Sequence, residues 1–224
     1  MLDGFHIRGA SFQPVRNGYA RDVLVDRQGY DPAVTKALVV GPGGDLLAGE
    51  LTRLGFDVTG PAGLDDPHQL PLGDKDVDVA YYADTFEITD DLDGVVAEAA
   101  RVVRDGGTVL YDTVNRTPLS RLLYLGVMQS WPGTRIFPRG RYAKDRLRPP
   151  ADVAAALGRH GLRNDDVRGF LPGSPLRLVK AMHRARKGTI GDDELAELSG
   201  MHLGPEGKAG PVTYLGFATK TEAA

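Results

Sequence analysis

The stretch Asp91–Arg116, DLDGVVAEAARVVRDGGTVLYDTVNR, decides the fold. Its first half has valines and alanines at helical spacing, which predicts a helix with one apolar stripe over Asp91–Arg104. The Asp-Gly-Gly of residues 105–107 then ends the helix, because glycine tolerates positive φ. The β-branched and apolar run Thr108–Val114 predicts a buried strand. A helix followed by a central strand is half of a parallel α/β unit, and such sheets bind ligands beyond the carboxyl ends of their strands.

The sequence on both sides of this stretch predicts further elements of one α/β domain spanning residues 1–224. Residues 1–35 are expected to be irregular, apart from a short helix near Tyr19–Arg27, and to cover the ligand site. Apolar periodicity and glycine or proline boundaries predict strands at Ala37–Val40, Phe56–Thr59, Val77–Tyr82, Val167–Leu171 and Val212–Thr219, and helices at Leu46–Leu54, Ala151–His160, Leu176–Lys187 and Asp192–Leu198.

Composition excludes several classes of function. The 27 basic and 30 acidic residues give a net charge of −3, so no overall positive field attracts nucleic acid. With no cysteine, the chain has no disulfide, thiolate metal site or cysteine nucleophile. No apolar run approaches the roughly 20 residues of a membrane span, and the first residues lack the apolar core of a signal peptide. A cytoplasmic protein is therefore expected.

Three segments resemble the class I S-adenosylmethionine-dependent methyltransferases. They are ALVVGPGGDLLAGELTRLGFDVTG at 37–60, ARVVRDGGTVLYDTVNRT at 100–117 and VTYLGFATK at 212–220. The Asn-Arg-Thr of residues 115–117 makes the chain similar to the 3-demethylubiquinol O-methyltransferase group within that class. The resemblance extends from about Lys36 to Lys220 and implies a Rossmann-like sheet, mostly parallel, with an antiparallel last strand.

The resemblance also implies where a cofactor binds. Between the first strand and the next helix the backbone has to turn sharply while approaching a ligand, and only glycine leaves room there. Gly41, Gly43 and Gly44 are the implied contacts of S-adenosylmethionine, with Asp45 at the start of the helix. The alternative is that glycine is simply favoured in any strand-to-helix turn.

This cofactor region is shorter than the family pattern and departs from it. The family has an acidic residue before the first glycine, where this chain has Val39, and another after the second strand, where it has Thr59-Gly60-Pro61-Ala62. An edge helix and an edge strand are expected to be missing, because an acidic-Pro segment follows within a few residues. In that segment Asp66 is the implied contact of the adenine amino group, and Asp65 or Asp66 is a candidate for the ribose.

Methyl transfer to oxygen needs an aligned hydroxyl and a group that takes its proton. In the loop after the third predicted strand, Asp84 and Glu87 match acids of the resembled group, whereas its histidine is replaced by Ile88. These acids are candidate catalytic groups and possible ligands of Mg²⁺. The alternative is that Glu87 and Asp90 cap the following helix. His68 is a further candidate base, because its loop is expected at the ligand edge of the sheet.

Substrate contacts are expected after the central strand. Asn115 and Arg116 are implied to face the substrate; alternatively, Asn115 ends the strand and Arg116 braces Asp112 or the next loop. Residues 117–148 form an insertion implied to cover the substrate, with Trp131 and Arg139 as candidate contacts.

The insertion is also basic and contains aromatic residues, with six basic side chains against one acid over residues 133–148. Peripheral contact with anionic lipid is one interpretation of this composition, and a solvated charged loop is the other.

Two functions remain open. The first is an O-methyltransferase that transfers a methyl group from S-adenosylmethionine to a phenol- or quinol-like small molecule. The second is a protein of this fold that has lost the cofactor and acts as a cofactor-free cyclase or isomerase, or as a non-catalytic binding partner. A nucleic-acid binder is disfavoured by the negative charge, and the sequence has no signal for an oligomeric state.

Overall fold

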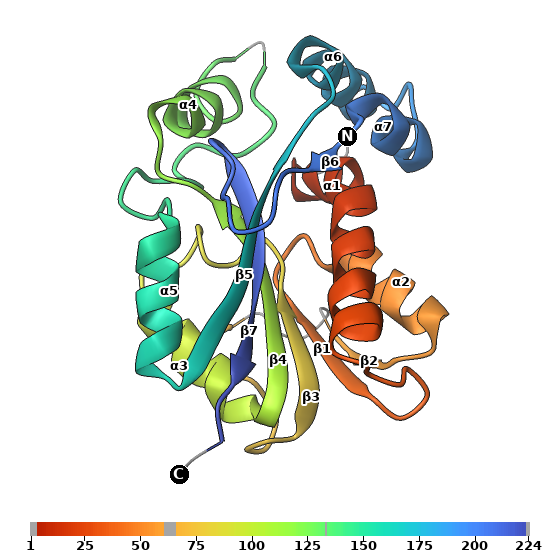
Figure 1. Ribbon diagram of the computed structural model, residues 1–224. Coiled ribbons are helices and arrows are strands. Elements are labelled where there is room, and N and C mark those ends of the chain that lie inside the picture. The colour runs from red at the N-terminus through yellow and green to blue at the C-terminus, as the bar shows by residue number, and fades with distance from the viewer. Residues whose placement is uncertain (1–3, 61–65, 133, 223–224) are drawn as a thin grey trace.

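The computed structural model describes residues 4–60, 66–132 and 134–222 (Figure 1). Within these residues, a seven-stranded sheet in the order β2-β1-β3-β4-β7-β5-β6 lies between helices on its two faces. The strands are β1 Lys36–Val40, β2 Asp57–Thr59, β3 Val77–Tyr82, β4 Val103–Val114, β5 Leu162–Leu171, β6 His202–Leu203 and β7 Thr213–Lys220. The α-helices are α1 Gly4–Arg21, α2 Asp45–Leu54, α3 Leu92–Val102, α4 Pro118–Ser120, α5 Pro150–Arg159, α6 Pro175–Arg186 and α7 Asp192–Ser199, with π-helical segments η1 Asp22–Arg27 and η2 Arg121–Val127.

The strand directions confirm the predicted sheet. β1 pairs in parallel with β2 and β3, and β3 with β4, whereas β7 runs antiparallel to its neighbours β4 and β5. β6, a two-residue strand paired with the end of β5, was not predicted. Among the described residues β2 is the outer strand of the other edge, in agreement with the expected loss of an edge unit. Pro61, Ala62 and Asp65 lie outside the described residues.

The sheet is buried on both faces, which explains the continuous apolar run of its central strand. Along β4, Val109 and Tyr111 pack on the side of α3 and α5, whereas Leu110 packs on the side of α1 and α2. This alternation is the two-residue period of a strand.

The N-terminal segment differs most from its prediction. Instead of an irregular cover with a short helix at Tyr19–Arg27, the chain forms α1 from Gly4 and continues through η1 to Arg27. α1 lies on one face of the sheet beside α2 and also contacts α6 and α7 (Figure 1). Apolar periodicity did not reveal it, because the buried side of α1 includes Arg8 and Arg16.

Smaller corrections concern local boundaries. Asp91, not Glu87 or Asp90, caps α3, because its carboxylate accepts a hydrogen bond from the backbone N–H of Gly94 at 2.9 Å. The strand predicted at Val167–Leu171 is longer and begins at Leu162, because it pairs with β7 along most of its length. No described helix has both the length and the apolar character of a membrane span.

Candidate active site

The carboxyl ends of β1, β3 and β4 meet beneath α1. Here five charged side chains form what we call the ion cluster: Arg8 and Arg16 from α1, Asp84 and Glu87 from the loop after β3, and Asp112 from β4. None of the five is more than 1% exposed. Because burying a charge is costly unless it is paired, these residues are held together by direct ion pairs.

Arg16 joins the three strand ends. Its Nη2 donates to Asp84 Oδ1 at 2.6 Å and to Asp112 Oδ1 at 2.7 Å, while Nη1 donates to the backbone oxygen of Gly43 at 2.9 Å. Tyr81 on β3 also donates to Asp112, from its hydroxyl to Oδ2 at 3.1 Å. One guanidinium therefore binds the turn after β1, the loop after β3 and the strand β4.

Arg8, two turns earlier in α1, binds the outer half of the cluster. Its Nη1 lies 2.6 Å from Glu87 Oε1 and 2.8 Å from Asp84 Oδ1, and donates to the Tyr142 hydroxyl at 2.9 Å. The second oxygen of Glu87 accepts from the Thr113 hydroxyl at 2.9 Å. Tyr142 belongs to the insertion, so Arg8 connects the insertion to the strand ends.

The pKa values of the two aspartates in the ion cluster are shifted in opposite directions. Burial raises the pKa of Asp112 to about 7; the charge of Arg16 opposes this shift and that of Asp84 adds to it. Burial also disfavours the charged form of Asp84, but Arg16 and Arg8 outweigh it and lower the pKa of that carboxyl. As pH falls through about 7, Asp112 is therefore the carboxyl of this pair that takes up a proton, and Asp84 stays ionised beside the arginines.

The ion cluster retains unused hydrogen-bonding atoms. Among the described residues, Arg8 Nε and Nη2, Arg16 Nε and Asp84 Oδ2 have no hydrogen-bond partner although they are buried. Asp84 also adopts a positive φ of 53°, a left-handed conformation that is unusual for a residue with a side chain. Unpaired buried donors beside a strained residue are typical of a functional site, since neither feature stabilises the fold.

The predicted glycine turn packs against this loop. A side chain at Gly43 would collide with Asp84 Oδ2, and one at Gly41, whose φ is 106°, would collide with the Ala83 oxygen and the Thr85 hydroxyl. The turn requires glycine, but the atoms that face it here are from the chain itself. Cofactor contact by Gly41, Gly43 and Gly44 therefore stays a prediction.

The other predicted cofactor residues lie at the surface. Asp45 is the exposed first residue of α2, beside the buried Gly44. Asp66 is exposed and accepts from the backbone N–H of His68 at 2.9 Å. Their roles toward a cofactor also stay predictions.

His68 belongs to a separate group of contacts. Its Nδ1 lies 3.0 Å from Asp66 Oδ1, and its Nε2 lies 3.1 Å from the Thr89 hydroxyl and 3.2 Å from the Asp91 oxygen. These contacts attach it to the start of α3 and give its predicted role as a base no support. Magnesium also lacks support: no group of three or more potential ligands occurs within the described residues, and Asp84 is paired with arginine.

Two of the predicted substrate contacts directly follow β4, and the other two lie on the insertion. Asn115 donates to the Gly210 oxygen at 2.9 Å and so ends β4, while Arg116 binds Asp152 at 2.9 Å and not Asp112. Arg116 also lines a cavity of about 480 Å³ together with Arg121, Lys144 and Asp145. Trp131 and Arg139 are exposed on the insertion and stay predictions.

Sequence reasoning missed three members of the ion cluster. Arg8 and Arg16 lie in a segment that lacked a helical signal, so their common orientation was not apparent. Asp112 had a recognisable signal, since it is the only charged residue in the apolar run Thr108–Val114. A charge within a buried strand requires a partner, and that requirement could have identified it.

Comparison with known proteins gives concordant matches. A family model described as a methyltransferase domain matches residues 63–111. The ubiquinone biosynthesis O-methyltransferase of Mesorhizobium japonicum is 30% identical over 175 residues, which cover 66% of this chain and 70% of that protein. The protein of the same name from Rhizobium etli is 28% identical over 190 residues, covering 70% of this chain and 74% of that protein.

Solved structures agree in fold. The YcgJ protein from Bacillus subtilis superposes with a TM-score of 0.55 at 14% identity, covering 94% of this chain and 100% of that one. A geranyl diphosphate methyltransferase in complex with S-adenosylmethionine gives a TM-score of 0.52 at 15% identity, covering 93% of this chain and 87% of that one. At these identities the likeness establishes the shared architecture.

Proposed function

This chain belongs to the S-adenosylmethionine-dependent methyltransferase family, and we propose that it methylates the hydroxyl oxygen of a phenol- or quinol-like small molecule. The choice of oxygen and of a quinol-like acceptor is supported by the names of the relatives, which are ubiquinone biosynthesis O-methyltransferases. The single structural observation behind the proposal is that Arg8 and Arg16 hold a carboxylate against the glycine turn.

The chemistry of these donors fits the cofactor. S-adenosylmethionine, when bound, supplies an electrophilic methyl group on a positively charged sulfur, and it also bears a carboxylate. Arg8 and Arg16 already bind a carboxylate, that of Asp84, and still have unpartnered N–H groups. We infer that Asp84 takes the place of the cofactor carboxylate, which Arg16 and the turn at Gly41, Gly43 and Gly44 would hold.

Binding at the turn then requires Asp84 to leave it. The loop after β3 provides the means, because Asp84 is held at positive φ by its two arginines, and rotation to an ordinary backbone conformation relieves that strain. The carboxylate of the cofactor would replace the carboxylate of Asp84 at the same guanidinium groups, so the two arginines would keep an anionic partner. Cofactor binding thus competes with an internal anion.

Proton removal is assigned to Glu87. One of its oxygens is held by Arg8 and the other by Thr113, on the strand that leads to Asn115 and Arg116. These contacts orient the carboxylate that would accept the proton of the acceptor hydroxyl. The cavity lined by Arg116, Arg121, Lys144 and Asp145 has more cations than anions and offers positive charge to an acceptor that becomes an oxyanion.

Calorimetry with S-adenosylmethionine and S-adenosylhomocysteine tests the proposal. We expect micromolar binding to the wild-type protein, tighter binding to Asp84→Gly and none to Gly43→Val, whose circular dichroism spectrum should remain folded. Mass spectrometry of catechol or hydroquinone acceptors should then show the gain of one methyl group. Absence of binding to both wild type and Asp84→Gly at millimolar ligand would overturn the proposal in favour of a cofactor-free role.

A further inference from the structure

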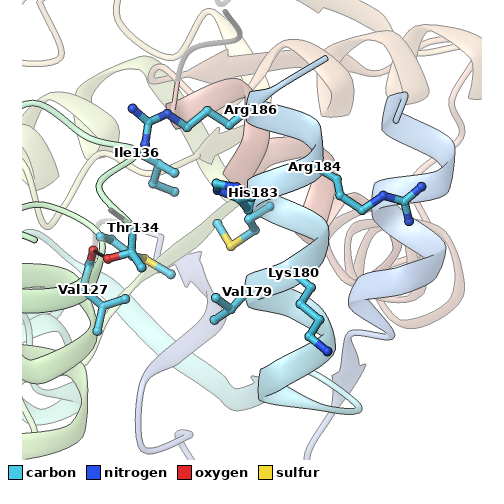
Figure 2. Close-up of a pocket in the computed structure, with 10 residues that line it drawn as sticks. Val127, Thr134, Ile136, Val179, Lys180, His183, Arg184 and Arg186 are labelled. Atoms are coloured by element: carbon cyan, nitrogen blue, oxygen red, sulfur yellow. Dashed lines mark hydrogen bonds between the residues drawn. The ribbon is translucent and has the colours of Figure 1, made fainter. Parts of the chain in front are cut away.

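A second cavity, of about 390 Å³, lies between the insertion and α6, outside the ion cluster (Figure 2). Its volume falls in the range of about 300–1,000 Å³ that is usual for small-molecule sites. The residues that line it are Val127, Met128, Thr134, Ile136, Val179, Lys180, Met182, His183, Arg184 and Arg186.

The interior of this cavity is apolar. Met128 and Ile136 from the insertion and Met182 from α6 belong to one hydrophobic cluster, which also includes Ile7 of α1. Val179 is 41% exposed beside them. Methionine and branched aliphatic side chains make a surface that adapts to an aliphatic chain.

The basic side chains of the cavity all come from α6. Figure 2 shows Arg186 extending toward Ile136 of the insertion, with His183 on the same helix, whereas Lys180 and Arg184 extend from the other side of α6. No acidic residue lines the cavity within the described residues. Arg184 is paired with Glu194 at 3.0 Å, and Arg186 donates to the backbone oxygen of Arg135.

Neither His183 nor Arg186 forms a salt bridge in the described part of the chain, and His183 is exposed. The arrangement is therefore apolar within and positive at the mouth. It complements a ligand with one aliphatic chain and one anionic head group, and does not suit a bare phosphate, which would have no use for the apolar interior.

We propose that this cavity binds a fatty carboxylate, with its chain between Met128 and Met182 and its carboxylate at Arg186. The site is separate from the proposed methyl-transfer site, because α1 lies between them. Ile7 packs in the cluster beneath the cavity, whereas the next residue, Arg8, turns to Glu87. Binding of the carboxylate requires neither S-adenosylmethionine nor the ion cluster.

The probe is dodecanoate, titrated below its micelle-forming concentration into the full chain and followed by calorimetry. We expect micromolar binding, and Arg186→Glu should weaken it about tenfold or more, because a charge-assisted contact is replaced by repulsion. Arg177→Glu, an equal charge change on the same helix at an exposed residue that does not line the cavity, should leave Kd within about twofold. Dodecanol, which has the same chain without charge, should bind more weakly than dodecanoate.

Several results would overturn the proposal. No heat with dodecanoate, or equal weakening by Arg177→Glu and Arg186→Glu, would show that no specific site exists. Binding only to vesicles that contain anionic lipid would identify α6 as a membrane-contact surface instead. Gly43→Val serves as the control for the other proposal, since it should abolish cofactor binding and leave dodecanoate binding unchanged.

Discussion

The carboxylate of Asp84 lies against Gly43, where the first carbon of a side chain at residue 43 would otherwise be. The two residues belong to the loops after β3 and β1, and Arg16 binds both of them. The glycine turn, read from the sequence as room for a ligand, is thus in contact with an anion of the protein. Under the proposed function, this contact would couple the stability of the fold to the binding of the cofactor.

The contact between Asp84 and Gly43 predicts energetic coupling. Gly43→Ala should lower the free energy of unfolding by about 1–3 kcal/mol, because the new methyl group collides with Asp84 Oδ2. In an Asp84→Gly background the same change should cost at least about 1 kcal/mol less. Urea denaturation of the four proteins measures the cycle.

A matched glycine provides the control for that cycle. Gly49 lies inside α2 with open space where a side chain would be placed, so Gly49→Ala should stabilise the protein by about 0.5–1 kcal/mol. Additive effects of the substitutions at residues 43 and 84 would contradict the described contact.

Asp84→Asn should separate stability from cofactor affinity. Removing the charge leaves Arg8 and Arg16 without one of their buried partners, and we expect a loss of about 3–5 kcal/mol in the free energy of unfolding. S-adenosylmethionine should restore part of it by bringing its own carboxylate, so the rise in Tm with ligand should exceed that of the wild type. An equal or smaller rise would argue against carboxylate exchange.

Asp112 predicts the pH dependence of stability. Because its pKa is raised from 3.8 to about 7, the folded protein keeps a proton that the unfolded chain has released over this interval. The free energy of unfolding contributed by this group therefore falls as pH rises from about 4 to about 7. Because the pKa of Asp84 is lowered, the stability that this carboxyl contributes is lost on acidification, at lower pH than the effect of Asp112. Denaturation of Asp112→Asn should show a flatter profile than wild type, and parallel profiles would refute the assignment.

Glu87→Gln tests the proposed proton acceptor. The amide retains the shape of the side chain and can still contact Thr113 and Arg8. We expect kcat to fall about 10²–10⁴-fold, since the proton of the acceptor hydroxyl loses its base. The Kd for S-adenosylmethionine should change little. An unchanged kcat would show that another group accepts the proton.

Arg116→Ala tests the cavity beside the acceptor. Arg116 is partly exposed and pairs with Asp152, so stability should fall by no more than about 1 kcal/mol. If the cavity binds the acceptor, KM for an acidic phenol should rise while KM for the cofactor remains the same. Asp152→Asn removes the same ion pair and keeps the cation, so it should not raise the acceptor KM.

The central part of the fold could be predicted from sequence because its signals are local. The order of helix and strand within residues 91–114, the turn at Gly41–Gly44 and the antiparallel last strand are confirmed, and so is the family resemblance. The prediction that residues 105–107 end the helix was wrong, because α3 already ends at Val102 and these residues lie within β4. α1 could not be predicted, because Arg8 and Arg16 interrupt the apolar stripe on which helix prediction depends. The alternative that Glu87 caps a helix was wrong, since the nearby Asp91 has the geometry of the cap.

The sequence by itself determined the strands of the described sheet apart from β6, and with them the edge at which the carboxyl ends of β1, β3 and β4 meet, because side-chain periodicity and glycine boundaries act over a few neighbouring residues. Only the tertiary structure decided what occupies that edge. Arg16 reaches Asp84 across 68 residues of sequence and Asp112 across 96, and no local pattern records such pairs. They form because the low-dielectric interior penalises each isolated charge, so the folded chain brings opposite charges together.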